Sequence, residues 1–296
     1  MQRKKVAILG VTGMLGSALE KEFSCYKACC SCVSKGETAG IDFDLIKTTR
    51  AELDAQNCTV EAIVKIIEGA EYAINCIGII KPYIHDNDSA EVQRAIEVNG
   101  LFPHKLAAAA NKTGTKVIQI ATDCVFDGLK GNYTEDDKHN AIDVYGKTKS
   151  LGEVSADNFL NLRCSIIGRE KKSYLSLLEW FLNQPKGAKL NGFKNHFWNG
   201  VTTNAFAKIC RGIIENDAFK AGLQHIVAAD SPSKAEMLHI FKEVFNRSDI
   251  IINDIDAEIA INRTLATNDD VKNAYLWRIA GYENIPTVKE MIEELA

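Results

Sequence analysis

The chain has 296 residues, of which 46% are hydrophobic, and its formal net charge is −4 at a pI near 5.9. An acidic chain without a broad basic surface is a poor partner for nucleic acid or for an anionic membrane. No run approaches 18 consecutive apolar residues, and Met1-Gln-Arg-Lys-Lys5 leads directly into a strand pattern rather than a signal peptide. We therefore expect a cytoplasmic protein with one elaborate domain or two lobes.

Short apolar runs alternate with helical patterns along most of the chain. Such alternation is typical of a doubly wound, parallel α/β sheet of the Rossmann type. The predicted strands are Val6–Leu9, Cys29–Val33, Ala73–Ile77, Val117–Ala121, Leu160–Ile167 and His225–Ala228. The predicted helices are Ser17–Phe23, Val60–Glu68, Ala90–Lys112, Val144–Ser155 and Thr203–Glu215.

The pattern changes after the fifth predicted strand. Residues 168–201 are irregular, aromatic and rich in glycine, and residues 229–296 contain two helical stretches around Ile250–Asn253. We expect residues 1–167, completed by about 202–228, to form the Rossmann domain. The other two segments, 168–201 and 229–296, are predicted to form a smaller substrate lobe that is discontinuous in sequence.

The first predicted strand ends in a glycine-rich turn. Gly10, Gly13 and Gly16 follow Val6–Leu9 at once, and a helix follows them. Glycines permit a tight turn and close approach of a pyrophosphate to the backbone, while the helix N-terminus supplies free N–H groups. The spacing differs from Gly-x-Gly-x-x-Gly and favours a nicotinamide cofactor loop of the short-chain dehydrogenase type.

Tyr145 and Lys149 are the strongest candidates for catalysis. Four residues apart on a helix, they share one face, so the ammonium is expected to lower the phenol pKa from about 10. Thr122 ends the strand pattern Val117–Ala121 and can hydrogen-bond the same substrate oxygen. An acid, its activator and an orienting hydroxyl are the parts of a reductase that protonates a carbonyl oxygen.

Nine cysteines raise the question of disulfides or a metal site. Cys25, Cys29, Cys30 and Cys32 crowd the predicted second strand, with no nearby histidine and no Cys-x-x-Cys pair. Alternate strand residues point to opposite faces, so these thiols do not converge on one ion. We expect reduced, packed thiols and no metal.

Five motifs, in order, give the chain a family resemblance. They are Gly10-Val-Thr-Gly-Met-Leu-Gly16, Ala121-Thr-Asp-Cys-Val-Phe-Asp-Gly128, Tyr145-Gly-Lys-Thr-Lys149 with Gly152-Glu153, Leu162-Arg-Cys-Ser-Ile-Ile-Gly168, and Trp198-Asn-Gly-Val-Thr-Thr203. Together they resemble the extended short-chain dehydrogenases, specifically the dTDP-4-dehydrorhamnose reductase group. The similarity spans nearly the whole chain.

The resemblance implies Thr122, Tyr145 and Lys149 as the catalytic residues, with Lys149 also holding the nicotinamide ribose. It also implies that the cofactor, NADPH or NADH, contacts a larger set: Gly10, Thr12, Gly13, Met14, Leu15, Gly16, Asp54, Cys76, Ile77, Gly78 and Asn99. Two members have other interpretations, because an aspartate before a helix is as often an N-cap and Asn99 can be a helix-surface amide. The end of the predicted second strand, Val33-Ser34-Lys35, lacks an acid for a 2′-hydroxyl, and Lys35 favours NADPH.

For the substrate, the resemblance implies a nucleotide-diphosphate sugar in the second lobe. The candidate contacts are Cys124, Val125, Phe126, His196, Trp198 and Asn199, with Arg163, Arg169 and Arg263 as possible diphosphate partners. Where the family has an acidic stretch after its nicotinamide loop, this chain has Ile79-Ile-Lys-Pro-Tyr-Ile-His-Asp86. The identity of the sugar is therefore open.

Cys124 stands two residues after Thr122, where related dehydratases have a proton-transferring Glu. Its presence argues against dehydration. In the epimerase-reductases a Cys at this position moves protons at the carbons beside the ketone, and His196 is a candidate partner for it here. The alternative, which we favour, is a packed and protonated thiol.

The function implied is NAD(P)H-dependent reduction of the 4-keto group of a nucleotide-diphosphate 6-deoxyhexulose, for surface polysaccharide sugars. One alternative is a bifunctional 3,5-epimerase/4-reductase. Another is a non-catalytic member that binds nucleotide and regulates a partner, as the regulatory subunit of methionine adenosyltransferase does. The sequence leaves open whether the chain forms a homodimer.

Overall fold

The structure is a computed structural model, and it describes residues 3–25, 41–170 and 174–296. Its main sheet has six parallel strands in the order β10-β5-β4-β3-β1-β2. They are β1 (Arg3–Leu9), β2 (Asp42–Thr48), β3 (Tyr72–Asn75), β4 (Lys116–Ala121), β5 (Phe159–Arg163) and β10 (Gly222–His225). The central strands are largely buried because helices cover both faces of the sheet.

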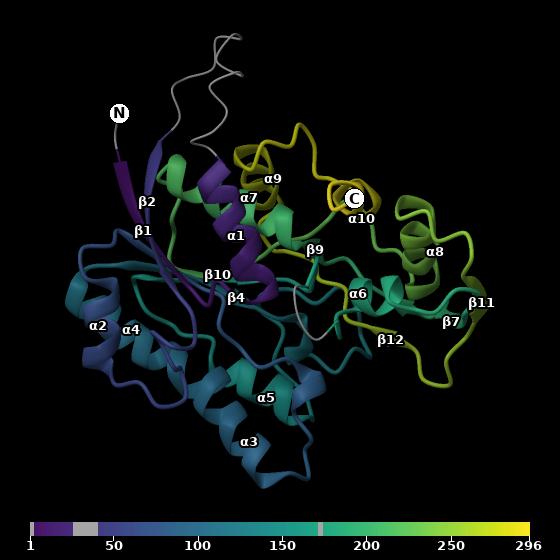
Figure 1. The fold of residues 1–296 in the computed structure, drawn as a ribbon, viewed down its shortest axis with the longest axis horizontal. Coiled ribbons are helices and arrows are strands. Elements are labelled where there is room, and N and C mark those ends of the chain that lie inside the picture. The colour runs from purple at the N-terminus through teal and green to yellow at the C-terminus, as the bar shows by residue number, and fades with distance from the viewer. Residues whose placement is uncertain (1–2, 26–40, 171–173) are drawn as a thin grey trace.

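Helices lie on both sides of this sheet (Figure 1). On one side α1 (Met14–Cys25) packs on α7 (Thr203–Glu215), which also contacts α9 (Asp270–Ile279). On the other side lie α2 (Val60–Ile67), α3 (Ser89–Ala95), α4 (Phe102–Thr113) and α5 (Val144–Leu151). Alternate residues of β1 enter the two cores, with Val6 and Ile8 in one and Ala7 and Leu9 in the other.

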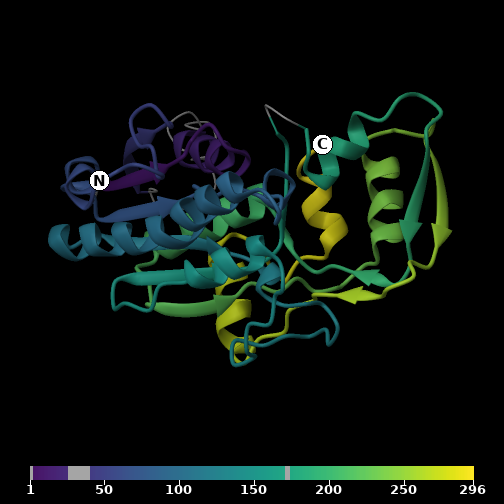
Figure 2. The same ribbon diagram turned by 90° about the horizontal axis from the view of Figure 1, so that it is seen from below.

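A second lobe lies beside the sheet, at the far end from the N-terminus (Figure 2). It contains three short parallel pairs, β7 with β11, β8 with β12 and β6 with β9. Its elements are β6 (Ile166–Ile167), α6 (Leu177–Leu182), β7 (Lys189–Phe193), β8 (His196–Phe197), β9 (Val201–Thr202), α8 (Lys234–Val244), β11 (Ile251–Ile255), β12 (Ile261–Asn262) and α10 (Val288–Glu293). One continuous cluster of buried apolar side chains joins the lobe to the sheet, from Val6 through Trp198 to Phe241.

The predicted fold class is confirmed, with local differences. The helix predicted over Val144–Ser155 ends at Leu151. The pattern Leu160–Ile167 divides into β5 and β6, and the last strand of the sheet begins three residues earlier than predicted, at Gly222. The helix predicted over Ala90–Lys112 contains a π-helical segment, η2 (Ile96–Leu101). Strand β2 was not predicted, because its sequence alternates acidic and apolar residues as an edge strand does. The predicted strand Cys29–Val33 lies outside the described residues, as does Lys35.

Two short 3₁₀ turns complete the set of elements: η1 (Lys81–Tyr83), after β3, and η3 (Asp123–Val125), after β4. Both follow the carboxyl ends of central strands, where ligands bind in open α/β sheets. Within the described ranges, none of the helices has the length and apolar character needed to cross a membrane.

Candidate active site

The glycine turn is shaped by contacts of its own backbone. A Cβ on Gly16 would lie 2.1 Å from the Gly10 carbonyl oxygen, so glycine is required there for the helix to start so close to the strand. A Cβ on Gly13 would meet only that same oxygen, at 3.5 Å. The fold itself therefore has no steric need for glycine at position 13, which suits a position that a ligand approaches.

Thr122, Tyr145 and Lys149 come together at the end of β4. Thr122 is the N-cap of η3, where its hydroxyl accepts from the Cys124 N–H at 3.2 Å and donates to Asp123 at 3.2 Å. The Tyr145 side chain hydrogen-bonds with Thr122. Lys149 Nζ donates to the Ile120 carbonyl at 3.3 Å, two residues before Thr122. The predicted grouping of a phenol, a hydroxyl and an ammonium is thus present in the structure.

Helix α5 lies tightly against this turn. A Cβ on Gly146 would lie 2.3 Å from the Cys124 carbonyl oxygen, so the residue after Tyr145 must be small. Asp143 caps the helix by accepting from the Gly146 N–H at 2.8 Å, and Lys81 of η1 pairs with the same carboxylate at 2.8 Å. These contacts fix Tyr145 in the first turn of the helix, next to η3.

Burial has the largest effect on the pKa values of both Tyr145 and Lys149. It raises the pKa of Tyr145 above its usual value, with a smaller upward effect from Cys124, while the hydrogen bond with Thr122 acts in the opposite direction. Burial also lowers the pKa of Lys149, against an upward effect from Glu153. The expectation that Lys149 lowers the phenol pKa is not met, because its ammonium is directed to the Ile120 carbonyl. The phenol is therefore protonated at neutral pH and suited to donate a proton.

The loop after β3 is held by buried amides. Asn75 accepts from the Ile77 N–H at 3.1 Å and donates to Gln119 at 2.8 Å. Asn99, on the π-helical segment, binds Ile79 twice, accepting from its N–H at 2.8 Å and donating to its carbonyl at 2.9 Å. Asn99 is buried and not a surface amide, and it braces the loop that contains Gly78. Burial raises the pKa of the Cys76 thiol in this loop.

Asp54 lies in the turn between β2 and α2. Its carboxylate accepts from the Gln56 N–H at 3.3 Å and from the Asn57 side chain at 2.8 Å, and it pairs with Arg50 at 3.6 Å. The N-cap of α2 is Thr59 and not Asp54. An adenine contact for Asp54 stays a prediction.

Cys124 follows Thr122 with its side chain largely enclosed. Burial raises the pKa of its thiol to about 12, with an additional upward effect from Asp123 and a smaller downward effect from Arg263. His196, the candidate proton partner, instead hydrogen-bonds through Nε2 with the Ile259 carbonyl at 2.9 Å. This geometry favours a packed, protonated thiol.

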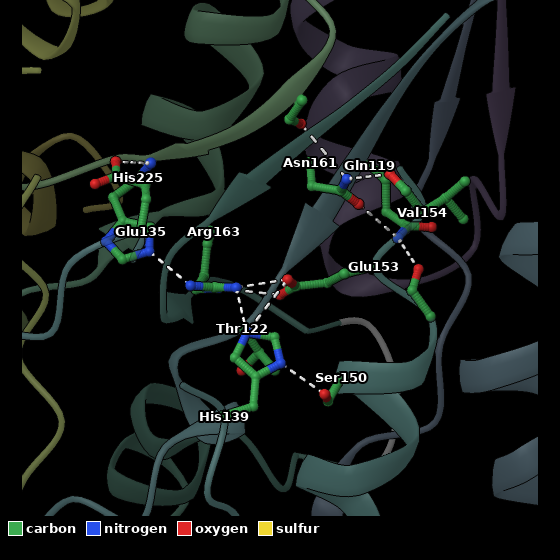
Figure 3. Close-up of polar contacts among 12 residues, drawn as sticks. Gln119, Thr122, Glu135, His139, Ser150, Glu153, Val154, Asn161, Arg163 and His225 are labelled. Carbon is green, nitrogen blue, oxygen red and sulfur yellow. Dashed lines mark hydrogen bonds and ion pairs between the residues drawn. The ribbon is translucent and has the colours of Figure 1, made fainter. Parts of the chain in front are cut away.

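Arg163 does not occupy a substrate site, and its prediction as a diphosphate partner is wrong. Its side chain is 0% exposed and forms a bidentate pair with Glu153, at 3.0 and 2.5 Å. The guanidinium also donates to His225 at 2.8 Å and to His139 at 2.6 Å (Figure 3). Because Glu153 follows the C-terminal end of α5, this buried network connects α5 to β5 and β10.

Several other residues predicted to contact the substrate have side chains that hydrogen-bond or pack within the protein. Asn199 is buried, and its amide donates to the Leu265 carbonyl at 2.7 Å and accepts from its N–H at 2.9 Å. Val125 and Phe126 lie in a small core with Tyr133, on which the Phe126 ring stacks at 4.2 Å. Their side chains support the site from behind and are not free to contact a substrate.

Three of the remaining candidates lie in the second lobe or at its edge. Arg169 pairs with Glu179 at 2.7 Å. Arg263 donates to the carbonyls of Phe126 and Asp127 at 2.9 and 3.1 Å, which brings its guanidinium close to η3. The Trp198 ring is buried and lies beneath the Lys234 ammonium, 5.5 Å from its centroid.

The sequence reasoning missed three polar residues in or near η3, the candidate catalytic turn: Asp123, Asp143 and Lys234. The first two have a local signal, since Asp123 follows Thr122 directly and Asp143 stands at an N-cap position before Tyr145. Lys234 has no such signal, because only the packing of α8 brings it to η3. Over the ranges that the structure describes, no group of three or more His, Cys, Asp or Glu side chains could hold a metal ion.

Comparison with known proteins places this geometry in a family. Residues 4–260 match the family model described as the RmlD substrate binding domain. Methionine adenosyltransferase 2 subunit beta from Mus musculus is 27% identical over 256 residues, which cover 82% of this chain and 72% of that protein.

Solved structures with the same fold include two dTDP-4-dehydrorhamnose reductases. That from Clostridium acetobutylicum has a TM-score of 0.75 at 22% identity and covers 98% of both chains. That from Bacillus anthracis, in complex with NADP, has a TM-score of 0.77 at 18% identity and covers 100% of this chain and 99% of its own. The chain belongs to the RmlD substrate-binding-domain family, among the extended short-chain dehydrogenases, as its motifs predicted.

Proposed function

We propose that the chain is an NAD(P)H-dependent oxidoreductase that reduces the 4-keto group of a nucleotide-diphosphate 6-deoxyhexulose, in the biosynthesis of surface polysaccharide sugars. The observation that carries the proposal is the grouping of Thr122, Tyr145 and Lys149 at the carboxyl end of β4. A protonated phenol, a hydroxyl hydrogen-bonded to it and a nearby ammonium are the groups that carbonyl reduction requires.

The glycine turn suits a dinucleotide. Gly10, Gly13 and Gly16 precede the N-terminus of α1, and Gly13 has open space where a side chain would be. NADPH or NADH would be held by this turn and by the loop Cys76-Ile-Gly78, and Lys149 would bind the nicotinamide ribose. When bound, the cofactor supplies a hydride to the carbonyl carbon. The Bacillus anthracis relative, which holds NADP, supports this assignment.

Tyr145 then acts as the general acid. As negative charge develops on the carbonyl oxygen, the phenol donates its proton to that oxygen, and Thr122 stabilises the same oxygen by hydrogen bonding. Lys149, whose ammonium is held by the Ile120 carbonyl two residues before Thr122, would act mainly on the nicotinamide ribose. The close contact between α5 and η3 holds the donor in place throughout.

A substrate panel tests this function. Purified protein is mixed with NADPH or NADH and with dTDP-, UDP- and GDP-linked 4-keto-6-deoxyhexoses, and NAD(P)H oxidation is followed by absorbance. We expect turnover with at least one of these ketones and none with the matching 4-hydroxy sugars. Absence of turnover with the whole panel, in protein that binds NADPH, would contradict the proposal.

A regulatory role is the second candidate, because the similarity to the mouse methionine adenosyltransferase subunit spans 82% of the chain. In that case the protein would bind a partner enzyme and change its activity, and Tyr145→Phe would have no effect on this regulation. Co-purification with a methionine adenosyltransferase catalytic subunit, followed by assay of that enzyme with wild-type and Tyr145→Phe protein, separates the two functions.

A further inference from the structure

Lys234 occupies an unusual position at the start of a helix. It is the first residue of α8, whose N-terminus is already satisfied by a capping box between Ser233 and Glu236. The N-terminal end of a helix dipole is unfavourable for a cation. Neither capping nor helix electrostatics therefore explains a lysine at this position.

Lys234 is partly buried, and its ammonium lies against the Trp198 and Met237 side chains. Its Nζ lies 5.5 Å from the centroid of the Trp198 ring and 3.9 Å from the Met237 sulfur. None of the ion pairs found in the described part of the chain includes it. Burial of a charged group without a partner costs free energy, so such a position calls for a further reason.

The neighbouring cations differ from Lys234 in this respect. Lys81 pairs with Asp143 at 2.8 Å, and Arg263 donates two hydrogen bonds to backbone carbonyls. All three cations act electrostatically on Cys124 or on Asp123, the residues of the catalytic turn. Lys234 alone among the three has neither a carboxylate nor a carbonyl as acceptor in the structure.

The titratable and charged groups that act electrostatically on Lys234 are Asp123 and Cys124 on η3 and Arg263 after β12. Burial lowers the pKa of Lys234 to about 8, while Asp123 and Cys124 raise it and Arg263 lowers it further. The ammonium is thus charged at neutral pH and becomes neutral in mildly alkaline solution.

We propose that Lys234 binds an anionic oxygen of the substrate's nucleotide diphosphate at η3. This inference rests on the proposed function, since it assigns a specificity-determining residue to the same site. An oxyanion beside Lys234 would supply the partner that the fold does not, and Arg263 would add a second positive charge nearby. The Trp198 face beneath the ammonium would keep it oriented toward η3.

The experiment measures binding of UDP, UDP-glucose and UDP-glucuronic acid by calorimetry at pH 7, with NADPH saturating. Lys234→Met keeps an unbranched apolar stem against Trp198 and Met237, so it should fold, and a thermal unfolding scan confirms this. We expect at least tenfold weaker binding of all three probes, because each of them carries the diphosphate.

Lys234→Arg and Lys65→Met serve as controls. The arginine keeps the charge and should retain most of the affinity, while Lys65 lies exposed on α2 and its replacement should change nothing. Wild-type affinity should fall above about pH 8, and Lys234→Arg should remove that dependence, because a guanidinium stays charged. A purely structural lysine would show neither effect.

Two results would count against the inference in distinguishable ways. Unchanged binding of all three probes by folded Lys234→Met protein would overturn it and leave the reductase function intact. Wild-type protein that binds none of the probes would contradict the nucleotide-diphosphate part of the proposed function, and the inference with it.

Discussion

The Rossmann part and the second lobe differ in how the positively charged side chains near η3 are partnered. In the Rossmann part, Arg163 is paired with Glu153 and donates to two histidines. In the second lobe, the Lys234 ammonium lies over the Trp198 ring and forms no ion pair among the described residues, although the Asp123 carboxylate acts on it electrostatically. A paired buried charge holds the fold together, whereas an unpaired one at a site is available to a ligand. The partner of a buried charged group therefore separates structural residues from functional ones.

Tyr145 tests the functional half of this comparison, and its replacement should have the largest effect. Tyr145→Phe keeps the ring and removes the proton donor, so turnover should fall about 10²–10⁴-fold. The free energy of unfolding should change by only about 1 kcal/mol, for one lost hydrogen bond. Steady-state kinetics and urea unfolding measure the two quantities. Near-normal turnover in the variant would remove Tyr145 from its catalytic role.

Arg163 tests the structural half of this comparison, because its guanidinium is already paired within the fold. Arg163→Met leaves the Glu153 carboxylate enclosed without its partner, and we expect the free energy of unfolding to fall by about 3–5 kcal/mol. Lys194→Met, which breaks an exposed pair with Asp256, should cost less than about 1 kcal/mol. Urea unfolding of both variants measures the difference. A loss under 1 kcal/mol for Arg163→Met, together with lost substrate binding, would return Arg163 to the site.

The error over Arg163 shows where sequence reasoning reaches its limit. The glycine turn and the pair Tyr145 and Lys149 could be predicted because their geometry is local, set by a strand end or by one helical turn. Thr122 was found because strand ends share one edge of a parallel sheet. The roles of Arg163 and Lys234 depend instead on contacts with side chains that are distant in sequence, and residue spacing does not predict such contacts.

The same reason explains which parts of the fold were missed. Strand β2 lacks the apolar run of its neighbours, and its pairing with β1 is defined only once the sheet forms. The π-helical segment that contains Asn99 interrupts an apparently continuous helical pattern. Its insertion satisfies a tertiary contact with Ile79, which no local periodicity indicates.

His225 gives the Arg163 network a pH dependence that can be measured. Its Nδ1 donates to the Ala266 carbonyl at 2.7 Å, so Nε2 accepts from Arg163 and the ring must be neutral. Burial, and then Arg163, lower the pKa of His225. The unfolded chain, with a histidine pKa of about 6.5, therefore binds more protons below that pH, and stability falls there as pH decreases.

We expect this loss to reach about 1.4 kcal/mol per pH unit between the unfolded and the lowered folded pKa of His225, and to level off below the latter. Urea unfolding at pH 5 to 8 measures it. His225→Gln, whose side-chain oxygen can still accept from Arg163, should show a shallower dependence. An equal slope in both proteins would mean that His225 does not titrate as part of this network.

For Cys124, a structural role and a role toward the substrate are hardest to tell apart, since it lies close to Thr122 and is also largely enclosed. With a thiol pKa raised to about 12 and His196 directed to Ile259, the structure favours packing. Cys124→Ser should then leave ketone reduction largely intact and lower the free energy of unfolding by about 1 kcal/mol, because a hydroxyl is costlier to bury. Cys58→Ser, at a half-buried thiol away from the site, is the matched control.

Deuterium labelling distinguishes packing from proton transfer at Cys124. If the thiol is only packed, product formed in deuterated water carries no deuterium at the carbons beside the ketone. If it moves protons, wild-type product carries label there, and Cys124→Ser abolishes the label while reduction of a ketone that is already epimerised survives. Label that disappears in Cys124→Ser would make the protein an epimerase-reductase. It would also show that an enclosed thiol without a cationic partner can contact the substrate. The presence or absence of a partner would then separate structural from functional roles only for charged groups.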